Sequence, residues 1–312
     1  MEAYLFVHFK EKFTPDGEQV YFGLSRDGFS WESVNNGQPI LESTMGEEGV
    51  RDFTITRTVD GRFIIMATDL GLANHFAGKY RNSWEVVSHE GSKYMAKWES
   101  GDLVHWSSQK LVKIGDENNG CAWAPDIIYD ETTGEYVVHF STILLDDPTD
   151  HITIDYVTTK DFENFSSPKI MCAKKDYSII DSNIVYFDGW YYRFIKNNSS
   201  DGHIYLERGK NLFGEFERLE EFDKEMDKLE KGCYEAPTCF RLANGKWCVM
   251  LDFYGCEKDK QGYVPFVADD ISTGKFIRSD AEFSFPYGFK HGTVLPITMD
   301  EYNRIKKAFP NG

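Results

Sequence analysis

The feature that most constrains the fold of this 312-residue chain is a turn signature that recurs along it. In each clear copy a serine or threonine is followed two positions later by an aspartate, and four positions after that by a large aromatic ring. Clear copies occupy residues 25–31, 100–106 and 159–165, and weaker ones surround residues 208–216 and 270–276. Such a repeat indicates that one structural unit has been used about five times.

A second series lies between the turns, where a polar residue opens an apolar, strand-like segment. Its members are Asp52, Asp126, Asp181, Glu235 and His291, separated by 74, 55, 54 and 56 residues (126−52, 181−126, 235−181 and 291−235). We expect these five residues to occupy a common structural position, at the start of the innermost strand of each unit. Five units of four strands predict a β-propeller, in which the five residues converge on the central axis.

The local patterns favour an all-β chain. Short apolar or alternating runs are separated by hairpin signals such as Asp60-Gly61, Asp188-Gly189 and Asn244-Gly245. Short helices are expected only over residues 219–229 and 300–308.

The two ends of the chain predict how the ring closes. One strand follows His291, and three candidate strands precede Asp52. One plus three complete a fifth blade, which removes the free sheet edges of an open ring. We therefore expect residues 1–312 to form a single five-bladed β-propeller catalytic domain, with the N-terminal strands completing the last blade. A two-domain β-sandwich protein is the alternative.

The charge and composition of the chain limit the classes of molecule that it can bind. The chain has 51 acidic residues against 34 basic ones, a net charge of −17, which repels nucleic acid and anionic membranes. No glycine-rich phosphate loop supports a nucleotide cofactor. The N-terminus shows no secretory signal, which predicts a cytoplasmic protein, or a secreted one if a leader has been removed. The sequence does not fix the oligomeric state.

Asp52, Asp181 and Glu235 suggest chemistry because apolar residues flank each of them. Burial raises the pKa of a carboxyl group, and carboxylates that share a funnel shift one another further. One site can then hold a protonated acid and an ionised base, which is the pairing that glycoside hydrolysis needs. The alternative is that these acids cap turns or bind a structural ion.

Five segments carry a family resemblance: residues 50–55, 123–127, 180–184, 234–238 and 290–294. They resemble the inner-strand motifs of glycoside hydrolase family 43, whose members are five-bladed propellers that hydrolyse arabinofuranosides and β-xylosides with inversion.

The resemblance assigns a role to each member of the polar series. It implies that Asp52 is the general base and Glu235 the general acid, and that Asp181 keeps the pKa of that acid high and orients it. Asp126 matches an axial residue that shapes the site. His291 matches a histidine that in some members helps to hold a Ca²⁺ ion or a water, so no cofactor is required and no metal ligand is assigned.

Other residues near these motifs are candidates for substrate binding. Trp123 is expected either to stack on a sugar at the rim or to pack in the protein, and Arg51 either to donate to a sugar hydroxyl or to pair with an acidic residue. Phe53 stands where the family usually has proline, and we expect it to narrow the mouth of the pocket. With Asp126 and His291 these residues complete the predicted binding set. The long stretch over residues 71–93 is expected to form a loop over the pocket.

The resemblance therefore implies an inverting, exo-acting hydrolase that removes terminal α-L-arabinofuranosyl or β-D-xylosyl groups from small oligosaccharides. Inversion predicts that the carboxyl groups of Asp52 and Glu235 lie about 6.5–9.5 Å apart. The alternatives are an endo-arabinanase of the same family and a propeller that binds carbohydrate without catalysis. The sequence leaves open arabinofuranoside, xyloside and galactofuranoside as substrates.

Overall fold

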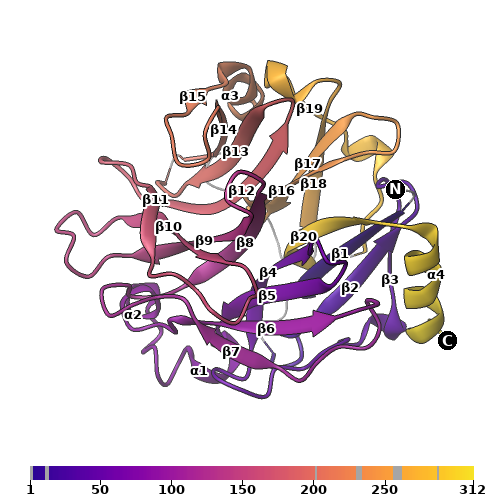
Figure 1. The fold of residues 1–312 in the computed structure, drawn as a ribbon, viewed down its shortest axis with the longest axis horizontal. Coiled ribbons are helices and arrows are strands. Elements are labelled where there is room, and N and C mark those ends of the chain that lie inside the picture. Colours follow the sequence, from indigo (N-terminus) through magenta and orange to yellow (C-terminus); the bar gives the residue numbers. More distant parts are fainter. Residues whose placement is uncertain (1–2, 11–13, 201, 230–233, 256–261, 287) are drawn as a thin grey trace.

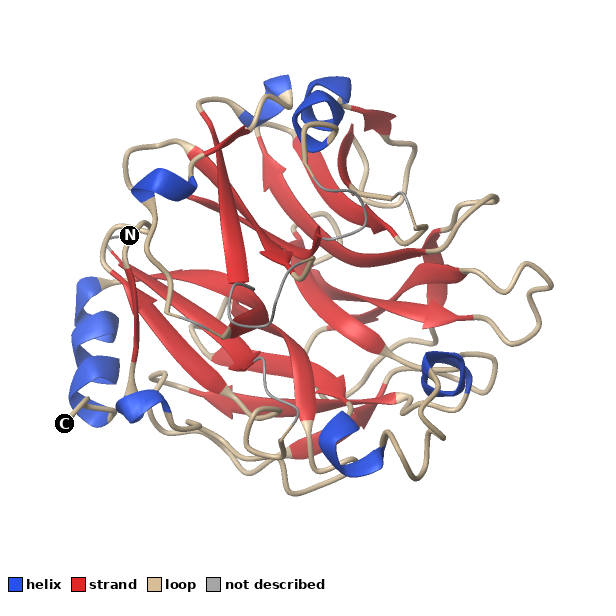
Figure 2. Cartoon of the chain, turned by 180° about the vertical axis from the view of Figure 1, so that it is seen from behind, coloured by secondary structure: helices blue, strands red, loops and turns tan. Residues whose placement is uncertain are grey.

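The computed structural model describes residues 3–10, 14–200, 202–229, 234–255, 262–286 and 288–312. These residues form five sheets of four antiparallel strands, arranged around a common centre (Figure 1). The predicted all-β, five-bladed β-propeller is therefore confirmed. Seen from behind, the strands radiate from the centre and the helices lie outside the ring of sheets (Figure 2).

Four blades are built from consecutive strands, with the first strand of each innermost. The first blade consists of β4 (Val50–Arg57), β5 (Phe63–Asp69), β6 (Tyr94–Ser100) and β7 (Lys110–Lys113). The second consists of β8 (Trp123–Asp130), β9 (Glu135–Ile143), β10 (Ile152–Thr159) and β11 (Lys169–Cys172). The third consists of β12 (Ile179–Phe187), β13 (Trp190–Asn197), β14 (Ile204–Gly209) and β15 (Glu217–Arg218). The fourth consists of β16 (Tyr234–Arg241), β17 (Trp247–Phe253), β18 (Gly262–Ala268) and β19 (Ile277–Arg278).

The last blade joins the two ends of the chain, as predicted. Its innermost strand is β20 (Phe289–Ile297), which pairs with β1 (Ala3–Lys10), and β2 (Tyr21–Ser25) and β3 (Trp31–Ser33) follow outward. Figure 1 shows β20 and β1 side by side near the centre. The pairing of the chain's first and last strands closes the ring.

The closure is tightest at Gly292, where a Cβ atom would lie 1.9 Å from the carbonyl oxygen of Val7. We expect Gly292→Ala to lower the unfolding temperature, because overpacking against a backbone that cannot move costs about 1–3 kcal/mol. Gly101→Ala is the control, since no atom lies within 4 Å of the added methyl group there. Thermal unfolding followed by circular dichroism measures both, and equal melting temperatures would contradict tight closure at Gly292.

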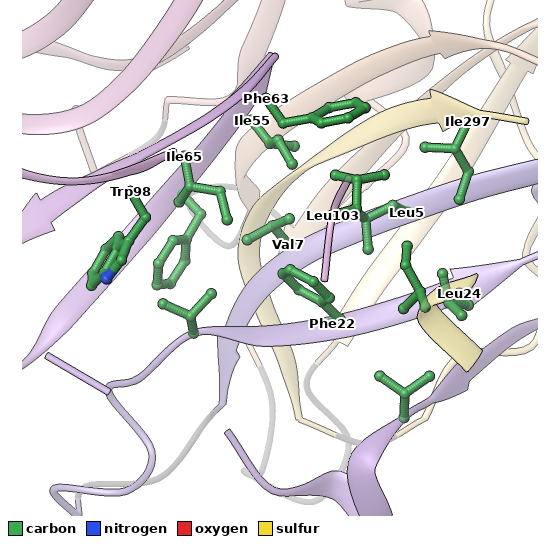
Figure 3. Close-up of a cluster of buried hydrophobic side chains, with 14 of the residues drawn as sticks. Leu5, Val7, Phe22, Leu24, Ile55, Phe63, Ile65, Trp98, Leu103 and Ile297 are labelled. Atoms are coloured by element: carbon green, nitrogen blue, oxygen red, sulfur yellow. The ribbon is translucent and has the colours of Figure 1, made fainter. Parts of the chain in front are cut away.

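Apolar side chains fill the space between neighbouring blades. The cluster in Figure 3 lies between the last blade and the first: Leu5, Val7, Phe22 and Leu24 come from the former, and Ile55, Phe63, Ile65 and Trp98 from the latter. Tyr302 and Ile305 of the C-terminal helix α4 (Met299–Ala308) belong to the same cluster. The ring thereby places its inner strands rigidly about the axis.

The repeated turn signature caps the hairpin between the two outermost strands of a blade. In the first copy the Ser25 hydroxyl accepts from the Gly28 N–H (2.9 Å), and the Asp27 carboxylate accepts from the N–H groups of Phe29 (2.7 Å) and Ser30 (2.9 Å). The copies at residues 100–106 and 159–165 repeat these bonds. The signature recurs because these three blades use the same turn.

Both expected helices are present, as α3 (Glu220–Met226) and α4. The stretch over residues 71–93 contains two further short helices, α1 (Leu72–His75) and α2 (Trp84–His89), which the sequence did not predict. One turn or two shows too little periodicity to be detected. None of the helices that the structure describes is long and apolar enough to span a bilayer.

Candidate active site

The pairing slips at the same place in all five inner strands. In four of them one residue there adopts a positive φ: Asp52 (52°), Ala124 (47°), Asp181 (53°) and Ala236 (51°). A bulge of this kind re-aims the side chains beside it.

The bulges correct the expectation that the polar series occupies one common position. Asp52, Asp181 and His291 are the first residues of their bulges, whereas Glu235 lies one residue before its bulge and Asp126 two residues after the first residue of its own. The repeated unit is set by backbone geometry, which the polar residues mark only approximately. Side chains at neighbouring positions of different blades can nevertheless reach the same space around the axis.

Asp52, Asp181 and Glu235 line one cavity of about 530 Å³. Arg51, Trp123 and His291, which we predicted to bind substrate, line it as well. Among the residues that the structure describes, the other members of its wall are Leu70, Trp84, Glu85, Ser88, Ala124, Ile152, Ile180, Lys196, Asn198 and Tyr254. The separation of the Asp52 and Glu235 carboxyl groups stays a prediction.

Two predicted binding residues do not line this cavity. Phe53 is 1% exposed and packs in the apolar cluster between blades, because neighbouring strand side chains point to opposite faces. The expectation that Phe53 narrows the mouth of the pocket is therefore wrong. Asp126 is buried at the axis, where Thr54 Oγ1 (3.0 Å) and Asn183 Nδ2 (2.8 Å) donate to its carboxylate, so it does not contact the cavity.

Asp126 belongs to a chain of hydrogen bonds that links all five inner strands. Asn183 Oδ1 accepts from the N–H of Cys239 (2.9 Å), and Thr238 Oγ1 accepts from the N–H of Val294 (3.1 Å). Thr293 Oγ1 donates to the Phe53 carbonyl oxygen (2.9 Å), which returns to the first blade. These bonds hold in place the strands that carry the three carboxylates.

Asp52 is paired with His291, whose Nδ1 lies 3.0 Å from its Oδ1. Burial raises the pKa of Asp52, but the charge and hydrogen bond of His291 and the charge of Arg51 outweigh it, so the pKa lies below its ordinary value. Burial alone would lower the pKa of His291, yet the carboxylates raise it to about 9. Near neutral pH Asp52 is therefore ionised and His291 protonated.

The pKa of Asp181 is shifted in the opposite direction to that of Asp52. Burial raises its pKa to about 6, and the negative charge of Glu235 acts in the same direction. Its carboxylate accepts from the N–H of Ala236 (3.2 Å), which places it directly beside the strand segment that carries Glu235.

Glu235 differs from the expectation. Its Oε2 lies 3.0 Å from Lys196 Nζ. Burial raises the pKa of Glu235, but the charges of Lys196, Lys290 and His291 together bring it below its ordinary value. The expected high pKa is therefore wrong for Glu235, and among the three carboxyl groups it is Asp181 whose pKa is raised.

Lys196 and Tyr254 are cavity residues that the sequence reasoning missed. Lys196 lies within the apolar strand β13, and its side chain is only 5% exposed. A lysine in a buried strand was the available signal, because lysine is almost never fully buried without a partner. Its partner lies in another blade, which no local pattern reveals.

The stretch over residues 71–93 contributes to the cavity through α2. Trp84, Glu85 and Ser88 line the wall, and the Trp84 ring meets the Trp123 ring edge to face, with centroids 6.4 Å apart. The two histidines of this stretch do not line the cavity. His75 contacts the Glu47 carbonyl oxygen, and His89 contacts the Asp150 carboxylate.

The Ca²⁺ ion or water expected near His291 stays a prediction. In the parts of the chain that the structure describes, no group of three His, Cys, Asp or Glu side chains is placed to hold a metal ion. His291 Nδ1 already contacts Asp52.

A five-bladed propeller with three carboxylates in one axial cavity defines the class of propeller glycosidases. The sequence model of the family described as "Probable glycosyl hydrolase domain", which is related to glycoside hydrolase family 43, matches residues 1–303. The chain belongs to this family, and the resemblance seen in its inner-strand motifs is confirmed.

Relatives agree with this assignment. An α-L-arabinofuranosidase of Bifidobacterium longum subsp. longum is 27% identical over an alignment of 302 positions, which covers 86% of this chain but only 27% of the relative. The chain thus spans about a quarter of that protein's length. The GH43 protein BlXynB of Bacillus licheniformis has a TM-score of 0.59 at 14% identity, covering 93% of this chain and 55% of its own. An endo-1,4-β-xylanase of Bacteroides thetaiotaomicron has a TM-score of 0.60 at 13% identity, covering 91% of each chain. At these identities the two structures establish the fold alone.

Proposed function

We propose that this glycoside hydrolase is exo-acting and removes terminal α-L-arabinofuranosyl or β-D-xylosyl groups from small oligosaccharides, with inversion. The observation that carries the proposal is the meeting of Asp52, Asp181 and Glu235 in one cavity, each with different charged neighbours. The likeness to an α-L-arabinofuranosidase supports the choice of sugar.

The three carboxyl groups have separate tasks in this reaction. Ionised Asp52 takes a proton from a water as that water attacks the anomeric carbon. The bond from that carbon to the glycosidic oxygen breaks, and the oxygen takes its proton from Glu235. Asp181 contacts the backbone next to Glu235 and orients it.

The exo mode is supported by the wall that α2 adds to the cavity. Trp84 and Trp123 stand together on that wall, where an endo-acting enzyme needs an open groove across the face. Because this wall occupies the place of such a groove, an endo-arabinanase is only the second candidate. The Trp84 side chain is 54% exposed, so it is available to stack on a sugar unit beyond the one that is cleaved.

Trp84→Ala is expected to raise the KM for an arabino- or xylo-oligosaccharide about 3- to 10-fold, because an aromatic stacking contact contributes about 0.5–1.5 kcal/mol. The kcat should change little, since Trp84 is not one of the reacting groups. Phe213→Ala is the control, because Phe213 is an exposed aromatic residue that stacks on Tyr156 outside the cavity wall. Steady-state kinetics on the purified variants measure both, and an unchanged KM for Trp84→Ala would show that this ring does not contact the substrate.

A panel of p-nitrophenyl α-L-arabinofuranoside, β-D-xyloside and β-D-galactofuranoside, together with arabinan, tests the proposed function. We expect nitrophenol release from one or both of the first two glycosides, and from oligosaccharides the release of monosaccharide with the remaining chain shortened by one unit. Oligosaccharide products from arabinan would favour the endo mode. Calorimetric binding without turnover on any substrate would favour a carbohydrate-binding propeller and contradict the proposal.

A further inference from the structure

Lys196 bridges two blades in the wall of the cavity. It lies on β13 in register with Ile180 of β12, in the third blade. Its ammonium group donates to Glu235 Oε2 (3.0 Å) in the fourth blade and to the Tyr254 hydroxyl (2.9 Å). Two contacts from one buried ammonium group fix its position against the carboxyl group assigned as the acid.

This contact conflicts with the task of a general acid. A carboxyl group that must donate a proton has to carry one, whereas an adjacent ammonium group favours the ionised form. Asp181 lies beside the same segment through its bond to the Ala236 N–H. The charge of Glu235 raises the pKa of Asp181, so the protonation of one carboxyl group affects that of the other, and a proton that they take up can reside on either.

We propose that Lys196 is a positioning residue that directs the shared proton of the Asp181–Glu235 pair to Asp181, and thereby sets the upper pH limit of hydrolysis. The proposal rests on the proposed roles of the three carboxylates. The raised pKa of Asp181, about 6, and the lowered pKa of Glu235 have the directions that it requires. The proton reaches Glu235 only when the ion pair with Lys196 weakens.

The other charges around Glu235 do not substitute for Lys196. Among the residues that the structure describes, the titratable and charged groups that face Glu235 are Asp52 (β4), Asp181 (β12), Lys196 (β13), Asp252 (β17), Tyr254, Tyr263 (β18), and Lys290 and His291 (β20). Lys290 contacts Asp252 (2.8 Å) and His291 contacts Asp52 (3.0 Å), so each of these cations is next to a carboxylate of its own. Lys196 makes its ion pair with Glu235 itself.

The pH dependence of kcat/KM on an aryl glycoside tests the proposal with Lys196→Met and Lys196→Arg. Loss of a cation next to a carboxylate raises its pKa by about 1–3 units, so the alkaline limb of Lys196→Met should move up by a similar amount. Lys196→Arg keeps the charge and should keep the wild-type limb. A uniform loss of activity with an unmoved limb in Lys196→Met would overturn the proposal, because a purely structural role reduces the rate at every pH.

A direct titration separates this proposal from the proposed function. Carboxyl ¹³C NMR, with the Glu235 signal identified by its absence from Glu235→Gln, reports the protonation of that group without any turnover. We expect the Glu235 midpoint to rise in Lys196→Met and to stay in Lys196→Arg. If Lys196→Met does not fold, Lys196→Gln replaces it in both measurements. An unchanged titration midpoint of Glu235 in Lys196→Met overturns the role of Lys196, even if the enzyme hydrolyses every glycoside. Inactivity on all glycosides refutes the proposed function, but the titration still decides whether Lys196 controls the protonation of Glu235.

Discussion

Asp52→Asn is expected to lower kcat about 10²- to 10⁴-fold, the range that general base catalysis contributes. Asparagine has nearly the same shape as aspartate but cannot take a proton from the attacking water. The carboxylate is suited to this task because His291 and Arg51 keep its pKa low despite burial. Steady-state kinetics on an aryl arabinofuranoside or xyloside measure the loss.

Glu85→Gln is the matched control for Asp52→Asn. Glu85 is another carboxylate in the wall of the same cavity, but it is exposed on α2 and has no proposed role in the reaction. It should retain nearly all of the wild-type kcat. An Asp52→Asn variant that stays within a few-fold of the wild type would exclude Asp52 as the base.

Glu235→Gln is expected to show a loss that depends on the leaving group. A sugar leaving group needs a proton, so oligosaccharide hydrolysis should fall about 10²- to 10⁴-fold. A dinitrophenolate departs without a proton, and hydrolysis of the corresponding aryl glycoside should fall far less. Rates on the two substrates, measured side by side, test the assignment.

Asp52→Asn provides the contrast, because the loss of the base should slow both substrates alike. Removing the partner of buried Lys196 also costs stability, so the folded fraction of Glu235→Gln must be checked by thermal unfolding before rates are compared. Equal losses of Glu235→Gln on both substrates, in folded protein, would rule out proton donation by Glu235.

Much of the fold could be predicted because each blade repeats the same local chemistry. The turn at Ser25 and Asp27 uses bonds within a few residues, so its sequence signature is preserved wherever the turn recurs. Closure of the ring by β20 and β1 followed from counting strands at the two ends of the chain. The helix α2 was missed because two turns carry little periodicity, although Ser83 caps it by accepting from the Val86 N–H.

The site could be predicted only where its residues belong to a recognisable local sequence motif. The motifs identified three carboxylates, which do share one cavity, but not the bulges that offset Glu235 and Asp126 from the other two. The low pKa of Glu235 depends on Lys196, which is 39 residues away in sequence and in another blade. Long-range ion pairs of this kind leave no trace in a local pattern.

The most direct test of a water-activating Asp52 opposite a proton-donating Glu235 is the anomer that forms first. Proton NMR during the first minutes of hydrolysis identifies this anomer before mutarotation brings the two anomers to equilibrium. We predict inversion, with β-arabinofuranose released from an α-L-arabinofuranoside or α-xylose from a β-D-xyloside. Release of the retained anomer would mean a covalent intermediate on a carboxylate, and would contradict the account.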